Sequence, residues 1–379
     1  MWLLSLGIAI TISLSSLSGK LSAAELVDFK GQLSGEYSGL SISDSYTNIF
    51  TLRYIPDLSL QKSIAPELSW DINISSNLYS TYQTHIDDST THEADFYRLN
   101  ASLQSPQSDI RLGLQKINFG PALLLRPLRW FDQVSPIDPL KLTEGVRGLR
   151  YRYVDLDNNS VWLWLLYGNS ELKGYEQSVT VDHTPELGGR FQFPTSNGEI
   201  GMSYHQRRTL FMGYSGVDLG HELTERRVAV DGKWDIGAGV WFEYVLVDQG
   251  AKTESAQNWF SMLTVGSDYT FSYGNGIHTL MEHLLSSTSD KAITWKDPLQ
   301  SSALQISYPV SILDSASFIL LYTWERQQAF QYVRWNRSYD NWAINLSAFV
   351  TSNGEQQSSD LLPTGTLGDG IQITVVYYH

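Results

Sequence analysis

Three side chains near residue 280 are of the types that bind zinc: His278, Glu282 and His283. A protein zinc site brings three or four such ligands together around one ion. Side chains alternate between the two faces of a β-strand, so on a strand His278 and Glu282 share one face while His283 points away. The three side chains therefore cannot converge, and we predict no metal site here.

Two other motifs resemble functional sites incompletely. Residues Asp155–Asn159 have the acidic spacing that begins a calcium loop, but Ser160 and Leu166 stand where that loop requires Gly and Glu. Residues Gly213–Val217 lack the second Gly of a nucleophile elbow. No His has a Ser and an acid nearby in a spacing typical of hydrolases. We predict a turn at 155–159, no enzymatic activity and no cofactor.

The composition excludes several classes of protein. The 379 residues include no Cys, which rules out disulfides, thiolate metal sites and covalent haem attachment through a Cys pair. A formal net charge of −14 argues against nucleic acid as a partner. With 17% charged residues and a mean hydropathy of −0.20, the chain is no helical membrane bundle. Aromatic residues reach 12%, which suits a protein with rings at two membrane interfaces.

The elements that position these side chains are strands, because apolar and polar residues alternate with a period of two. The alternation is clear in Phe29–Tyr37, Leu68–Leu78, Tyr97–Gln104 and Trp342–Val350. Such segments are about ten residues long, the length that crosses a hydrocarbon core at a tilt. The pattern alone also fits a soluble sheet, so the links between the segments decide.

The links alternate between long and short, and from Phe29 onward they separate roughly eighteen strands, an even number as in single-chain bacterial barrels. The long links are Thr81–Glu93, Asn118–Arg147, Asn169–Glu186, His205–Glu222, Ser286–Ser301 and Thr351–Asp369. The short links, most of which contain turn-forming residues, are Ser105–Ser108, Asp155–Asn159, Pro194–Gly198, Asp231–Trp234, Tyr273–Gly276 and Asn336–Asn341. The link near Gln327–Gln328 is short where a long one is due, so a barrel of sixteen strands is the alternative.

Long links on one rim and short links on the other are typical of outer-membrane proteins. We therefore predict an all-β fold: an antiparallel transmembrane β-barrel of about eighteen strands. The long loops are expected to be extracellular, and the short turns and both termini periplasmic.

Both ends of the chain agree with an outer-membrane location. Trp2–Leu17 is apolar but too short and polar to span a membrane, and Ser22–Ala24 offers a cleavage site. Residues 1–24 are therefore predicted to be a signal peptide that exports the barrel, residues 25–379, across the inner membrane. Gly370–His379 resembles the C-terminal strand that the outer-membrane assembly machinery recognises, with His379 in place of the usual Phe or Trp. The expected partners are this machinery and outer-membrane lipid.

One segment resembles a known family. Residues 111–120 read RLGLQKINFG, 123–132 read LLLRPLRWFD, 136–139 read PIDP and 143–153 read TEGVRGLRYRY. This is similar to a widespread group of porin-like outer-membrane barrels in which a strand ending near INWG leads through RPLDxFxPxDP to EGVxALR. Phe119 replaces the commoner Trp, and Gly148 stands where Ala is usual. The resemblance implies an outer-membrane channel and names no substrate.

The loop predicted at Asn118–Arg147 has about thirty residues, well beyond ordinary loops, so it is functional or disordered. Its many apolar residues argue against disorder. The strand Val161–Tyr167 is apolar on both faces, so its inward face needs a cover that the loop could provide. We expect the loop to fold into the lumen as a constriction; an external flap packed on itself is the alternative. The predicted constriction residues are Leu123, Leu124, Arg126, Arg129, Trp130, Phe131, Asp132, Asp138 and Glu144.

Five arginines are predicted to line the pore. If the apolar face of each strand points outward, the inward face carries Arg98, Arg111, Arg150, Arg152 and Arg190. Charges inside a membrane protein face water or a partner. An arginine wall beside a constriction would favour anions. Equally, the guanidinium groups could pair with loop carboxylates such as Asp132, Asp138 and Glu144.

The resulting hypothesis is a porin-like channel for passive diffusion of small hydrophilic solutes, with anions as one option. Two alternatives stay open: a specific export or uptake channel for a saccharide, and a plugged scaffold barrel that sheathes a partner protein. A homo-oligomer is compatible with each of them. The sequence leaves the transported substrate, the ion selectivity and the oligomeric state undecided.

Overall fold

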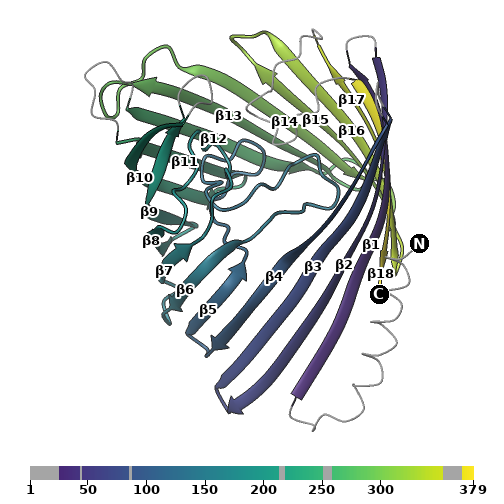
Figure 1. Ribbon diagram of the computed structural model, residues 1–379. Coiled ribbons are helices and arrows are strands. Elements are labelled where there is room, and N and C mark those ends of the chain that lie inside the picture. The colour runs from purple at the N-terminus through teal and green to yellow at the C-terminus, as the bar shows by residue number, and fades with distance from the viewer. Residues whose placement is uncertain (1–24, 43–44, 85–87, 213–217, 251–257, 353–368) are drawn as a thin grey trace.

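The alternating segments form eighteen strands that hydrogen-bond in one antiparallel sheet (Figure 1). The computed structural model describes residues 25–42, 45–84, 88–212, 218–250, 258–352 and 369–379. These residues contain no helix that is long and apolar enough to cross a membrane. The predicted signal peptide, residues 1–24, and the motif at Gly213–Val217 lie outside the described residues.

The strand bounds, in chain order, are β1 Glu25–Ile42, β2 Ser45–Ala65, β3 Leu68–Thr84, β4 Ser89–Gln104, β5 Ser108–Gln115, β6 Val146–Val154, β7 Ser160–Tyr167, β8 Pro185–Thr195, β9 Gly198–Met212, β10 Asp218–Asp235, β11 Gly239–Asp248, β12 Trp259–Phe271, β13 Ile277–Ser289, β14 Leu299–Pro309, β15 Asp314–Thr323, β16 Gln328–Ser338, β17 Trp342–Thr351 and β18 Asp369–Tyr378. Each strand pairs with the next along the chain, and β18 pairs with β1, so the sheet is a closed barrel. The prediction of an antiparallel barrel of eighteen strands is confirmed. The link near Gln327 is indeed only residues 324–327, and sixteen strands is wrong.

Several predicted links have other bounds in the structure. Asp231–Trp234 lies inside β10, and the turn follows at residues 236–238. This stretch has turn-forming residues, but pairing on both sides keeps it extended. His205–Glu222 mostly belongs to β9 and β10, since β9 continues to Met212. The link between β5 and β6 is residues 116–145, two residues earlier at each end than predicted.

The last residue closes the barrel. The backbone N–H of His379 donates to the carbonyl of Gly31 at 3.0 Å, and Gly31 donates back to His379 at 3.0 Å. The imidazole lies directly over Gly31, where an added Cβ would collide with it. The Tyr54 hydroxyl is 3.1 Å from Nε2, and the Phe29 ring is 5.6 Å away. His379 thus occupies an aromatic cluster at the seam, as a Phe or Trp would.

The height of the wall varies around the barrel (Figure 1). Strands β1 to β4 have 16 to 21 residues, whereas β5, β6 and β7 have only 8 or 9. Since 9 to 11 residues cross a membrane as a tilted strand, the short strands barely span and the long ones project beyond it. The outer faces of the short strands are rich in exposed leucines, among them Leu112, Leu149, Leu163 and Leu165.

The rule that apolar side chains face outward holds for only part of the barrel. On β11, Trp241, Val245 and Val247 point inward with Glu243, and all four are buried. Leu280 and Leu284 of β13 and Ile319 of β15 are also inward and buried. An inward face can be apolar only where protein covers it, because water would otherwise wet it. The link between β5 and β6 provides that cover.

Candidate functional site

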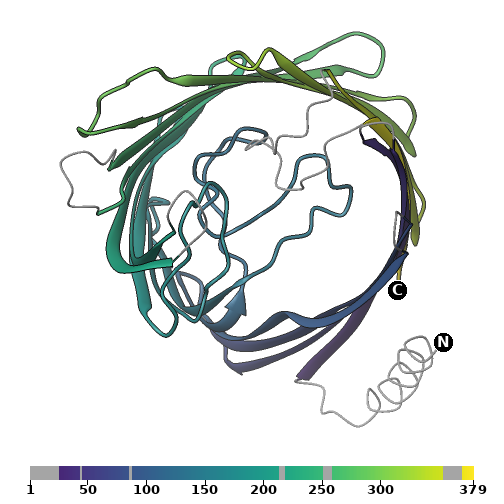
Figure 2. The ribbon, with the colours of Figure 1, turned by 45° about the horizontal axis from the view of Figure 1, so that its top comes forward.

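Residues 116–145, which we call the inner loop, cross the space enclosed by the strands (Figure 2). Their apolar side chains pack against the wall as part of the main hydrophobic cluster. Phe119 stacks on Trp164 of β7 with 5.8 Å between ring centroids, and Phe131 meets the same ring edge-on at 5.4 Å. The inward face of β7, apolar in sequence, is thus covered by the inner loop. Further loop residues buried in this cluster are Ile117, Ala122, Leu124, Leu125, Leu128 and Trp130.

A buried glutamate on β11 holds the loop from the opposite wall. The side chain of Glu243 is completely inaccessible to solvent. Its Oε1 accepts a hydrogen bond from the N–H of Ala122 at 2.9 Å, and its Oε2 accepts one from Leu128 at 2.9 Å. The carboxylate therefore satisfies two loop amides that would otherwise be buried without partners.

A second glutamate, on β13, binds the intervening residues. Glu282 Oε1 accepts from the N–H of Leu123 at 2.7 Å and from Trp241 Nε1 at 3.1 Å. Its Oε2 accepts from Leu124 at 2.9 Å and from Leu125 at 2.6 Å. On β12, the Thr264 hydroxyl donates to the Leu125 carbonyl at 2.7 Å. The N–H groups of residues 122–125 and of Leu128 thus all donate to two carboxylates. This arrangement fixes the backbone of the loop in one position.

The far end of the loop contacts a third part of the wall. The Tyr332 hydroxyl of β16 donates to the carbonyl of Ile137 at 3.0 Å. Asp138 accepts from the N–H groups of Leu140 and Leu142, both at 2.9 Å, and so stabilises the turn. The loop therefore extends from β5 across the barrel to β16.

Inside the loop, two arginines are buried. Arg126 pairs with Asp132 at 2.7 Å and also donates to Asn118 at 2.7 Å. Arg129 lies over the ring of Tyr175, 5.1 Å from its centroid. Burial raises the pKa of the Tyr175 hydroxyl, so this ring stays neutral beside the guanidinium. Both arginines stabilise the loop rather than facing open water.

Residues 168–184, which we call the second loop, also bind the inner surface of the wall. Glu176 of this loop accepts a hydrogen bond from Arg227 of β10 at 2.7 Å and forms an ion pair with Arg207 of β9 at 3.1 Å. Glu225 pairs with Arg207 at 2.7 Å and completes a buried network of two arginines and two glutamates. A buried network is stable only if each charge has its partners, and here each has.

The arginines predicted on β4, β5 and β6 lie together on the inward face. Arg111 is 3.6 Å from Asp109, and Arg150 forms an ion pair with the same carboxylate. Arg152 is exposed, with its guanidinium 5.0 Å from the Trp162 ring centroid. Arg98 donates to the backbone carbonyl of Thr143 at 3.0 Å and so also contacts the inner loop.

Arg190 is placed differently from the other four. It is buried on β8, donates to both oxygens of Asp231 at 2.5 and 2.8 Å, and lies over the Phe119 ring. Close by, Trp164 Nε1 donates to His205, whose other ring nitrogen is 3.1 Å from Glu186. Arg190 therefore belongs to the packed side of the barrel and lines no open space.

The alternative that loop carboxylates pair with the five predicted arginines is not what the structure shows. Asp132 pairs with Arg126 inside the loop, Asp138 binds loop amides, and Glu144 is 3.1 Å from Lys173. The partners are strand residues instead, Asp109 and Asp231. Asp109 lies on the same strand as Arg111 and on the strand next to Arg150, and Asp231 lies two strands from Arg190. The loop acids instead contact backbone N–H groups and cations of the loops.

The open part of the lumen lies on the side away from the buried glutamates. Inward side chains of β2 and β3, including Arg53, Asp57, Asp71 and Asn73, keep partial exposure. They bond mainly to polar neighbours: Arg53 donates to Asn77 at 2.7 Å, and Asn73 donates to Asp57 at 2.9 Å. On β11, by contrast, every second side chain is buried. The inward face of the barrel is thus packed on one side and partly exposed on the other.

Comparison with known proteins supports the architecture. No family model and no curated protein matches the sequence. Among solved structures, OccK5 (OpdH) of Pseudomonas aeruginosa has a TM-score of 0.58 at 11% identity, covering 93% of this chain and 97% of its own. OccAB1 of Acinetobacter baumannii has a TM-score of 0.58 at 8% identity, covering 94% and 97%. An anion-selective porin from Comamonas acidovorans has a TM-score of 0.50 at 11% identity, covering 94% and 100%. The fold is that of outer-membrane porins.

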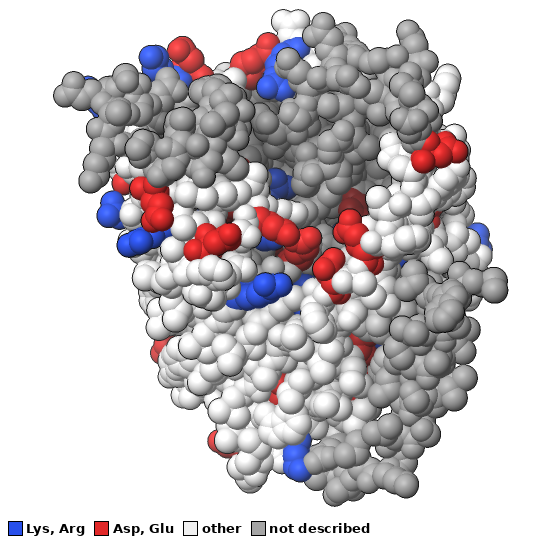
Figure 3. Space-filling model, in the orientation of Figure 1, with Lys and Arg blue, Asp and Glu red and all other residues white. Residues whose placement is uncertain are grey.

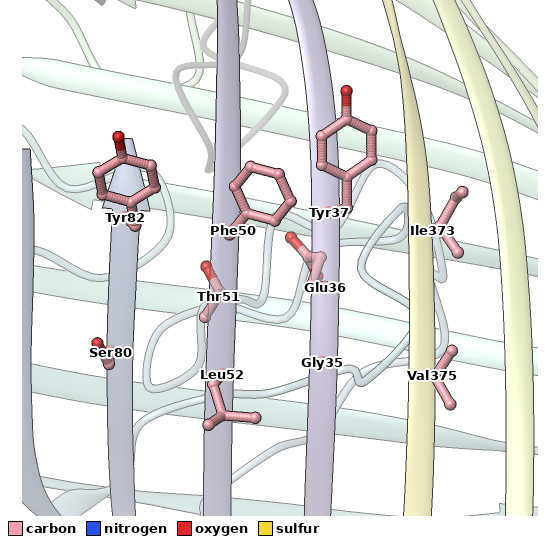
Figure 4. Close-up of a pocket in the computed structure, with 10 residues that line it drawn as sticks. All are labelled: Gly35, Glu36, Tyr37, Phe50, Thr51, Leu52, Ser80, Tyr82, Ile373 and Val375. Carbon is pink, nitrogen blue, oxygen red and sulfur yellow. The ribbon is translucent and has the colours of Figure 1, made fainter. Parts of the chain in front are cut away.

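The outer wall of this porin-like barrel has a groove centred on Gly35 of β1 (Figure 4). Its rim is formed by side chains of β2, β3 and β18, including Phe50, Leu52, Tyr82 and Ile373, which are apolar or aromatic and exposed. Such a surface suits the surrounding lipid. The groove brings together no set of groups able to do chemistry.

The motifs considered for chemistry have structural roles in the porin-like barrel. Glu282 binds the inner loop, His278 lies 3.3 Å from Asp268, and His283 contacts Ser302 at 2.9 Å on the other face of β13. The three side chains do not converge. Asp155 accepts from the N–H groups of residues 157 and 159 at 2.9 and 2.8 Å, which makes 155–159 a turn as predicted.

The sequence reasoning missed the two glutamates that hold the loop. A signal was present, because each is a lone acid in an apolar run: VWFEYVLV around Glu243 and LMEHLL around Glu282. A charge within a membrane-spanning segment marks a cavity or a partner. The sequence suggests only a metal ligand at Glu282, because the residue to which it binds, Leu123, lies about 160 residues earlier in the chain.

Proposed function

We propose that this porin-like barrel is an outer-membrane channel through which small hydrophilic solutes diffuse passively. The observation that carries the proposal is the asymmetry of the lumen. The inner loop is held against β11 to β13 by Glu243 and Glu282, while some inward polar side chains of β2 to β6 stay partly exposed, among them Arg53, Asp71 and Arg111. A solute would pass between the loop and this polar wall, with the loop as the constriction.

We further propose that the channel favours anions. Four inward arginines, Arg98, Arg111, Arg150 and Arg152, lie on β4 to β6, and three aspartates, Asp57, Asp71 and Asp109, share this region. On β5 and β6 alone, three of these arginines, Arg111, Arg150 and Arg152, share the inward face with a single acid, Asp109, so this part of the wall is positive. In a narrow passage with low-dielectric walls, such a field raises the local concentration of anions.

The orientation belongs to the same proposal: termini and short turns in the periplasm, long loops outside, and export by the segment 1–24. The natural chain has no Cys, so single cysteines can be labelled cleanly. Ala292→Cys, in the link between β13 and β14, should react with a membrane-impermeant maleimide on intact cells. Asn158→Cys, in the turn between β6 and β7, should react only after lysis, and the opposite pattern would overturn the orientation.

Conductance in a planar bilayer tests the function directly. Purified protein should give stepwise ion currents, and a salt gradient should give a reversal potential of the sign set by anions. Absence of current from a folded barrel would favour a plugged scaffold. Current that one class of saccharide blocks at low concentration would favour a specific saccharide channel.

A further inference from the structure

The upper part of β4 is a strand edge without a neighbour. β5 pairs only with the segment from Leu99 to Gln104. The preceding residues, Ser89 to Arg98, pair with β3 on one side. On the other side, no backbone partner exists among the described residues, and residues 89–96 are all exposed. Figure 1 shows this edge beside the low part of the wall, where β5 stops short.

On the opposite side of the low wall, β9 has a projecting edge that can be compared with that of β4. β8 pairs with β9 only as far as Gln206, and β9 continues to Met212. Here the second loop runs alongside as an extended segment. The N–H of Val181 donates to the Arg208 carbonyl at 2.9 Å, and the N–H of Leu210 donates to the Val179 carbonyl at 3.0 Å. The barrel thus covers one projecting edge with an added strand and leaves the other uncovered.

The uncovered edge is acidic on its inward side. Glu93 and Asp95 point inward, since they pair with Tyr79 and Asn77 of β3. Glu93 accepts a hydrogen bond from the Tyr79 hydroxyl, and neither acid forms an ion pair with a described residue. The outward side carries Ala94 and the exposed ring of Phe96. Acidic side chains, with basic ones among them, gather at mid-height on the face of the molecule seen in Figure 3, above a band with few charges.

We propose that the upper edge of β4 binds an extended basic segment of another protein, which adds a strand to the sheet. Free N–H and C=O groups on an edge are a template for such pairing. The added strand would place basic side chains beside Glu93 and Asp95 and apolar ones beside Ala94 and Phe96. Alternating basic and apolar residues are therefore the expected sequence pattern of the partner.

The same acids disfavour a second copy of this chain as the occupant. Two copies pairing antiparallel through this edge would bring Glu93 and Asp95 of both into one face, and like charges across a strand pair are destabilising. The β-bulge at Tyr97 and the inward charges are also devices that keep edges from indiscriminate pairing. The edge is thus selective for a partner of opposite charge.

The experiment uses the full barrel in detergent and an eight-residue fluorescent peptide of alternating Lys and Val. Anisotropy should show saturable binding. A peptide of the same sequence with an N-methyl group on every residue keeps the charge but has no backbone N–H to donate on either edge, and should bind at least about tenfold more weakly, because several backbone hydrogen bonds are lost. Equal affinity of the two peptides would show binding by charge alone and overturn the proposal.

A variant pair tests the role of charge. Glu93→Gln with Asp95→Asn should weaken binding of the unmodified peptide about tenfold. Asp340→Asn, at an exposed turn on the opposite rim, is the matched control and should leave it unchanged. A failure of the double variant to weaken binding would exclude a basic partner. Self-association of the wild-type protein that the double variant strengthens would point to a second copy instead. Conductance plays no part in either readout, so the result is independent of the proposed function.

Discussion

Two walls of the barrel carry inward charges and use them in opposite ways. On β11 and β13, Glu243 and Glu282 are buried, and both oxygens of each accept hydrogen bonds from loop amides. On β4 to β6, arginines face the hydrated side of the lumen, and Arg152 is exposed. The glutamates position a segment of the chain, whereas the guanidinium group of Arg152 is exposed and holds no part of the chain in place.

The difference shows that the sign and number of lumen charges do not determine the field in a pore. A carboxylate that receives several N–H groups in a dry site is compensated by fixed dipoles and reaches no solute. A guanidinium beside water acts within about 8–10 Å at physiological salt. The two glutamates therefore exert little electric field on a passing solute as long as the inner loop covers them.

The largest effect is expected from removal of the inner loop. Replacing residues 121–136 with a short Gly/Ser bridge should raise single-channel conductance severalfold, because the constriction is lost. The wall should persist, since its strands hydrogen-bond to one another without the loop. Glu243 and Glu282 would then face water, so the reversal potential should also move towards cations. Unchanged conductance in a folded deletion variant would show that the loop does not narrow the lumen.

A smaller change removes only the anchors. Glu243→Gln with Glu282→Gln places amide N–H groups against the N–H groups of the loop. Hydrogen bonds to a buried charged group contribute about 1.5–3 kcal/mol each, so the loop should loosen. We expect noisier currents of higher conductance, with an increase below that of the deletion. Asp268→Asn, an inward acid on β12 that contacts His278 and not the loop, is the control and should leave the conductance unaltered.

On the opposite wall, Arg152→Glu should shift the reversal potential towards cations with little change in conductance. Arg152 has the Trp162 ring as its neighbour and keeps its charge exposed. The fold should tolerate the change, because lumen substitutions tune selectivity while lipid-face charges destabilise a barrel. Arg152→Lys keeps the charge and should behave as wild type. If Arg152→Glu has no effect on selectivity, the arginine wall does not control the passage.

The smallest effect is expected from Asp109→Asn. This change frees Arg111 and Arg150 from their shared carboxylate, so the anion preference should increase modestly. The shift has the opposite sign to that of Arg152→Glu, and both are measured in the same salt gradient. Heat-dependent mobility on a denaturing gel checks that each variant is folded. A shift towards cations would mean that the two arginines move away from the pore once they lose Asp109.

The alternation of residues and the lengths of the links together were enough to predict the strands, the closed antiparallel barrel and the site of the long loop. Period-two patterns report directly on a strand with two different environments, and turn-forming residues mark where it reverses. The pattern also placed Arg98, Arg111, Arg150 and Arg152 on one face. Errors of bounds, as at Asp231–Trp234, arose because pairing on both sides keeps turn-forming residues extended.

Only the tertiary structure decided what lies opposite each inward face. Alternation assigns a residue to a face but does not say whether that face meets water, lipid or another segment. The contacts of Glu243 and Glu282 join residues that are 115 to 159 positions apart in the sequence. Because these contacts hold the inner loop against the wall, the inward face of the wall beneath it can be apolar. Arg190 and Arg152 look alike in the sequence, yet one is sealed beneath Phe119 and the other faces the lumen. Their difference depends on the path of the inner loop, which is determined by packing and hydrogen bonds across the barrel rather than by any local pattern.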